Sequence, residues 1–76
     1  MPQERKYLLG GYEITAKTDD SGRPIFVEAT KLRGNGWAIF HYETGKYATS
    51  GGLAGDTAKY ALSVEVSEWT REREAK

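Results

Sequence analysis

The chain has 76 residues, and its 11 Lys and Arg residues balance 11 Asp and Glu residues, so its formal net charge is zero. This length has room for one hydrophobic core, which predicts a single domain over residues 1–76. Zero net charge excludes the strong long-range attraction with which basic proteins bind nucleic acid or acidic membranes. With no Cys and one His, disulfide scaffolds, thiolate zinc sites and other metal or cofactor centres are not expected.

The N-terminal two thirds of the chain have the pattern of consecutive β-strands. Residues 1–6 are polar or charged and are predicted to be frayed, while the apolar patch at 7–9 predicts a lead-in strand or a tether. Later stretches alternate in hydrophobicity or are rich in β-branched and aromatic residues, and turns rich in Gly, Asn and Asp separate them. The predicted strands are 12–18, 24–32, 37–42 and a short fourth strand at 47–49.

The C-terminal third predicts a helix. Segment 50–55 is rich in Gly and is expected to be a flexible linker to a helix over 56–75. Apolar residues recur there at helical spacing. The stripe is Ala58, Ala61, Leu62, Val66 and Trp69, with Tyr60 and Val64 outside it. A strand is the competing interpretation for 60–69, because residues 62–67 alternate and include β-branched side chains that favour strands.

These elements predict an α+β fold in which an antiparallel meander of three to four strands carries one C-terminal helix packed on one face. An all-β small barrel is the alternative if 60–69 is a strand. Hairpin pairing of Ile14 with Val27, and of Ala29 with Phe40, would bring the apolar positions to one face. The expected core is Tyr12, Ile14, Ala16, Ile25, Val27, Ala29, Phe40, Tyr42, Leu62, Val66 and Trp69.

The same pairing leaves apolar side chains on the second face of the sheet, namely Phe26, Leu32, Trp37 and Ile39. A contiguous exposed apolar patch usually marks an interaction site. Two alternatives compete with this interpretation. Segments 7–9 and 51–55 could fold over the patch, or the two faces could be exchanged.

Candidate sites for catalysis are weak. The predicted register places His41 opposite Glu28, where a carboxylate could orient an imidazole, but a cross-strand surface pair is the more economical interpretation. The Gly-rich segment 50–57 lacks the Gly-Lys-Ser/Thr ending of a phosphate-binding loop, and Asp56 would repel a phosphate. No catalytic residue and no metal ligand is therefore assigned, and the protein is not expected to be an enzyme.

The leading hypothesis is a small non-catalytic binding protein of the cytoplasm that acts as a regulator or inhibitor through protein–protein contact. Small proteins encoded by phages and mobile elements fit this description, and a homodimer is compatible with it. The expected interface consists of Phe26, Leu32, Trp37, Ile39 and His41. The partner's identity does not follow from the sequence.

Nucleic-acid binding is the alternative from another class of function. Sheet-face recognition combines stacking aromatics with cations, and Trp37 could stack on a base while nearby cations contact phosphates. The cations assigned to this alternative are Lys17, Lys31, Arg33 and Lys46. The interspersed acidic residues and the zero net charge oppose it.

Overall fold

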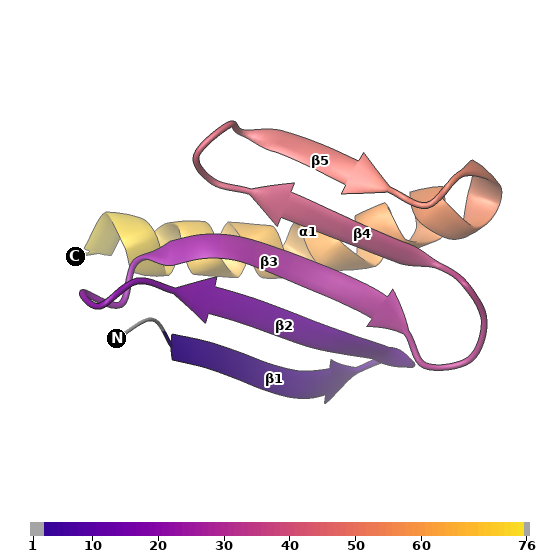
Figure 1. Cartoon of the computed structure of the whole chain (residues 1–76), viewed down its shortest axis with the longest axis horizontal. Helices are drawn as coiled ribbons and strands as arrows, with labels where there is room; N and C mark the ends of the chain where they lie inside the picture. The colour runs from indigo at the N-terminus through magenta and orange to yellow at the C-terminus, as the bar shows by residue number, and fades with distance from the viewer. Residues whose placement is uncertain (1–2, 76) are drawn as a thin grey trace.

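The computed structural model describes residues 3–75, with side chains described as far as Arg71. Five antiparallel strands form an open sheet in the order β1-β2-β3-β4-β5, and a long helix crosses one face of it (Figure 1). The elements are β1 (Gln3–Leu9), β2 (Tyr12–Thr18), β3 (Pro24–Lys31), β4 (Trp37–His41), β5 (Lys46–Thr49) and α1 (Gly52–Ala75). The predicted α+β meander with a C-terminal helix is confirmed, whereas the small barrel is wrong.

The strand count of three to four is also wrong, because the N-terminal segment forms a full strand. Gln3–Leu9 pairs with β2 along its whole length, although residues 1–6 were predicted to be frayed and 7–9 to be a lead-in strand or a tether. Residues 1–2 of the frayed prediction lie outside the described residues. A two-residue turn at Gly10 and Gly11 joins the strands, with φ of +54° and +83°. Glycine adopts left-handed conformations at low cost, and a turn with two of them in succession matches the twist of a hairpin. The adjacent glycines therefore fold the polar N-terminus back onto the sheet.

The first predicted register is wrong by two residues, although the predicted faces are right. Ile14 lies opposite Ala29 rather than Val27. One residue of the shift comes from the β2–β3 turn, which is one residue longer than predicted and pairs Thr18 with Pro24. The other comes from a β-bulge, since Lys17 pairs with Phe26 and Ile25 is an extra residue on β3. Since side-chain direction has a period of two, the shift leaves the core face unchanged but removes Ile25 from the core cluster.

The second hairpin is shifted in the same way. Its connection is longer than the predicted two-residue turn at Gly34 and Asn35, so Trp37 lies opposite Thr30 rather than Leu32. Ala29 consequently faces Ala38, a core residue that the predicted register missed. The connection is closed by the Lys31 amide, which donates to the Gly36 carbonyl at 2.7 Å.

The helix interpretation of 60–69 is confirmed, and the predicted apolar stripe of α1 packs against the sheet. Ala58, Leu62 and Val66 are buried, whereas Tyr60 and Val64 are exposed. The helix begins at Gly52, so residues 52–55 are helical rather than part of a linker. No helix in the described part of the chain is both long and apolar enough to cross a membrane.

The core lies between α1 and the sheet. Small side chains, including Ala29 and Ala38 on the sheet and Ala58 on the helix, let the two layers approach closely. The buried apolar residues are Tyr12, Ile14, Ala16, Val27, Ala29, Ala38, Ala58, Leu62 and Val66. Phe40, Tyr42 and Trp69, predicted as core, are only partly buried and pack around this cluster.

Candidate binding face

The sheet has one face against α1 and a second face that no described segment covers. Figure 1 looks onto this second face, with α1 behind the strands. Residues 7–9 belong to edge strand β1, and residues 52–55 belong to α1, so neither segment folds over it. An exchange of the two faces is excluded, since Ile14 and Val27 are fully buried on the helix side. We call this second surface the open face.

Apolar side chains gather on β3 and β4 of the open face. Pairing places Trp37 opposite Thr30, Ile39 opposite Glu28, and His41 opposite Phe26, all on the side away from α1. Trp37 is 39% exposed, and Phe26 and Ile39 are partly buried among their neighbours. The apolar cluster on the open face is therefore Phe26, Trp37 and Ile39, extended by Ala48 of β5, which pairs with Ile39. Leu8 of β1, 68% exposed, is on the same face but is separated from Trp37 by Glu13 and Thr30.

Trp37 is held in place through its backbone. Its amide donates to the Ser50 hydroxyl at 3.1 Å, and its carbonyl accepts from the Ser50 amide at 3.0 Å. Ser50 immediately precedes the turn into α1, so the start of β4 is tied to the start of the helix. A large aromatic on a fixed backbone loses little conformational entropy when it binds a partner.

The structure separates Leu32 from this cluster, whereas His41 stays next to the cluster but loses its predicted partner. Leu32 lies beyond the end of β3, is 54% exposed, and donates its amide to the Gly11 carbonyl at 3.0 Å. His41 lies beside Phe26, with ring centroids 6.1 Å apart, and not opposite Glu28. The predicted His–carboxylate pair is therefore wrong, because the two-residue shift of the second hairpin moves Ile39 into the position opposite Glu28.

The four cations of the nucleic-acid hypothesis do not form one patch. Lys17 and Lys46 share a cross-strand row with Phe26 and His41 on the open face. Lys31 pairs with Tyr12 at the other end of the sheet, and Arg33 follows in the β3–β4 connection. Among the described residues, no group of three His, Cys, Asp or Glu side chains is placed to hold a metal ion.

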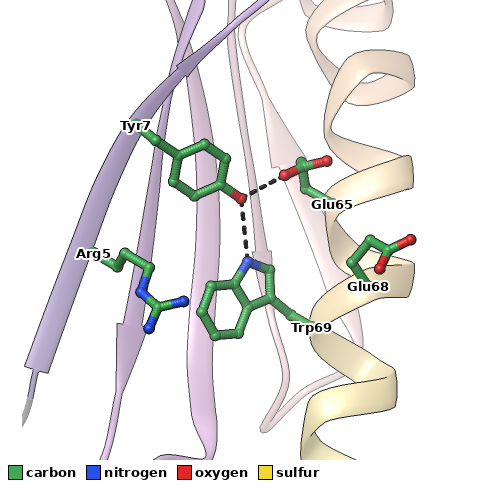
Figure 2. A pocket seen from close by; sticks show the side chains of 5 residues that line it. All are labelled: Arg5, Tyr7, Glu65, Glu68 and Trp69. Atoms are coloured by element: carbon green, nitrogen blue, oxygen red, sulfur yellow. Dashed lines mark hydrogen bonds between the residues drawn. The ribbon is translucent and has the colours of Figure 1, made fainter.

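A second feature, which the sequence reasoning missed, is a shallow hollow of about 310 Å³ between β1 and α1 (Figure 2). Tyr7 donates its hydroxyl proton to Glu65 Oε1 and accepts a hydrogen bond from Trp69 Nε1 at 3.3 Å. The Arg5 guanidinium lies over the Trp69 ring, 5.4 Å from its centroid. Glu68 completes the lining. The alternation of Arg5 and Tyr7 along the N-terminal segment was the available signal, but it required treating that segment as a strand.

Burial raises the pKa of Tyr7 to about 12, and the hydrogen bond to Glu65 acts in the same direction. Because the ordinary value is 10.0, the neutral phenol stabilises the folded chain fully below about pH 10, and this stabilisation is lost as the pH rises toward 12. We expect absorbance titration of the tyrosines near 295 nm to contain a late phase that Tyr7→Phe reduces, the remainder coming from Tyr47, whose pKa is also raised by burial. Tyr60→Phe, on a side chain that is 79% exposed and outside this hollow, is the control and should leave the late phase in place. If the late phase were unchanged in Tyr7→Phe, the hydrogen-bond network of Tyr7, Glu65 and Trp69 would be contradicted.

Comparison with protein-family models, curated proteins and solved structures finds no match to this chain.

Proposed function

We propose that the chain is a small non-catalytic binding protein that regulates or inhibits a partner protein by docking its open face on it. The observation that carries the proposal is the cluster of Phe26, Trp37 and Ile39 on adjacent strands, on the side of the sheet away from α1. An antiparallel sheet with one covered face usually shows solvent a polar second face. Apolar side chains placed together on the second face are characteristic of an interaction surface.

The composition around the cluster also supports protein recognition. Protein interfaces commonly combine a central aromatic anchor with a polar rim, and Trp is among the residues that most often dominate binding energy. Here Glu13 and Lys17 of β2 border the apolar side chains on the same face, and Glu28 of β3 lies among them, opposite Ile39. This mixture of signs suits a protein surface of matching charge pattern better than a polyanion.

Loss of Trp37 is the direct test. Tagged protein is used to isolate a partner from extracts of the source organism, the partner is identified and purified, and its affinity is measured by calorimetry. We expect Trp37→Ser to weaken binding by about 30-fold or more, as for an aromatic hot spot. Tyr60→Ser, on the outer side of α1, is the matched control and should leave the affinity unchanged, because Tyr60 is exposed on a different surface. Equal affinity of wild type and Trp37→Ser would contradict the proposal.

Nucleic-acid binding is the second candidate function, because two cations flank two aromatic rings in one row across four strands. The row consists of Lys17, Phe26, His41 and Lys46. The same purified protein can be used to distinguish protein binding from nucleic-acid binding. Binding of single-stranded oligonucleotides that is monitored by Trp fluorescence and weakens steeply between low and moderate salt would support this candidate over the first. A contact dominated by apolar area should instead tolerate salt.

A further inference from the structure

Edge strand β1 is a long and regular hydrogen-bonding surface. Its seven residues pair with β2 without interruption, and within the described chain no further strand lies on its outer side (Figure 1). The other edge, β5, has four residues. Exposed edges of this kind are templates for pairing with another strand, and proteins commonly protect them by shortness, bulges or charge. β1 is neither short nor bulged, so its charges decide what can pair with it.

The backbone groups that face outward on β1 follow from its hairpin. In a two-residue hairpin, the residues that flank the turn exchange hydrogen bonds, and the pairs alternate from there along the ladder. Leu9 and Tyr12 flank the turn, so Leu9 and every second residue before it bond inward to β2. The N–H and C=O groups of Glu4, Lys6 and Leu8 consequently point away from the sheet, where a further strand could reach them.

We infer that the occupant of this edge is a second copy of the chain, whose β1 pairs antiparallel with the first so that Glu4 of each copy lies opposite Lys6 of the other. The two residues already attract each other within one chain, where Lys6 Nζ lies 3.4 Å from Glu4 Oε1. Both have outward backbone groups, so the ladder hydrogen bonds and the charge pairs fall at the same positions. Opposite charges placed across a strand pair are stabilising, whereas like charges are destabilising.

Other antiparallel registers of the two edges fit less well. Moving one strand by two residues in one direction places Lys6 opposite Lys6 of the second copy, which is a like-charge pair between outward-bonding residues. A further step places Lys6 opposite Leu8 and leaves the charge without a partner. Moving the strand by two residues in the other direction places Glu4 opposite Glu4, which is again a like-charge pair. The charge pattern of β1 therefore favours the register that pairs Glu4 with Lys6.

The central residue of the selected register is Arg5, which lies opposite its own copy. Its guanidinium is directed over Trp69 of its own chain, in the hollow that Glu65 and Glu68 also line (Figure 2). These carboxylates lie on the same side of the sheet as both Arg5 side chains and offset their repulsion. The twofold axis stands perpendicular to the sheet, so the two open faces lie side by side in one ten-stranded surface. This inference concerns a different surface from the proposed function and does not depend on it.

Charge exchange tests the register. Sedimentation velocity of the full chain, from micromolar to millimolar concentration, should show a reversible dimer. Lys6→Glu or Glu4→Lys alone should weaken dimerisation by at least about tenfold, because each creates two repulsive pairs by symmetry. The double variant Glu4→Lys/Lys6→Glu should restore it. An equimolar mixture of the two single variants should form a heterodimer more tightly than either single variant self-associates.

Lys46→Glu is the matched control, because it makes the same charge change on the opposite edge of the sheet. Thermal unfolding of each variant checks that it is folded, and the exposed positions of Glu4 and Lys6 make a large loss of stability unexpected. A monomer at all concentrations would overturn the inference. A dimer that persists in Lys6→Glu would also overturn it, and if that dimer is lost in Trp37→Ser, the open face is the contact between copies.

Discussion

Leu62→Ala is expected to lower the free energy of unfolding by about 2–5 kcal/mol, the range for truncating a large aliphatic side chain in a packed core. Leu62 is fully buried at the centre of α1, where it packs against the cluster formed by β2, β3 and β4. The small side chains around it, including Ala29 and Ala58, cannot expand to fill the space. A cavity therefore remains, and its cost adds to the lost transfer free energy.

Urea unfolding followed by far-UV circular dichroism measures this effect, and Val64→Ala is the control within the same helix. Val64 is 57% exposed, so its truncation removes little buried area and should change the stability by less than about 0.5 kcal/mol. The total stability of a chain of this size is about 5–15 kcal/mol or less, so Leu62→Ala removes a large part of it. Similar effects of the two substitutions would contradict the placement of Leu62 in the core.

The division of residues between the two faces could be predicted because it depends only on alternation. Ile14, Val27 and Ala29 face the helix as predicted, even though each hairpin is shifted by two residues. The shift itself could not be predicted from hydrophobicity, because moving a strand by two residues along its partner leaves every side chain on the same face of the sheet. It is determined by local turn geometry. In the first turn, the Asp19 carboxylate accepts hydrogen bonds from the amides of Ser21 and Arg23.

The same distinction explains the candidate sites. Phe26, Trp37 and Ile39 share a face by alternation alone, so the apolar cluster followed from the sequence. The partners of His41 and the position of Leu32 depend on register, so the predicted His41–Glu28 pair and the inclusion of Leu32 failed. The N-terminal half of β1 was missed because its residues, Gln3–Lys6, are polar and have no apolar alternation. Pairing with β2 supplies the hydrogen bonds that stabilise such a segment as a strand.

Gly55→Ala is expected to destabilise the chain by about 3 kcal/mol or more, although the helix propensity of Ala alone would favour it by about 1 kcal/mol. A Cβ atom at Gly55 would lie 1.6 Å from the Ser50 carbonyl oxygen and 3.2 Å from Thr49 Cβ. The first of these neighbours is backbone and cannot rotate away. The first turn of α1 must therefore move away from the end of β5, or the chain must unfold.

The displacement should also reach the open face, because the Ser50 amide and hydroxyl hold the backbone of Trp37. We expect Gly55→Ala to lower the thermal midpoint and to shift the fluorescence of Trp37, measured in a Trp69→Phe background so that one indole reports. Gly51→Ala is the matched control, since a Cβ at Gly51 meets no atom within 4 Å and its φ is not in the left-handed region. If Gly55→Ala were neutral or stabilising, the gain in helix propensity would exceed the free-energy cost of the overlap. The close approach of Gly55 to the Ser50 carbonyl, which links the start of α1 to the backbone of Trp37, would then be contradicted.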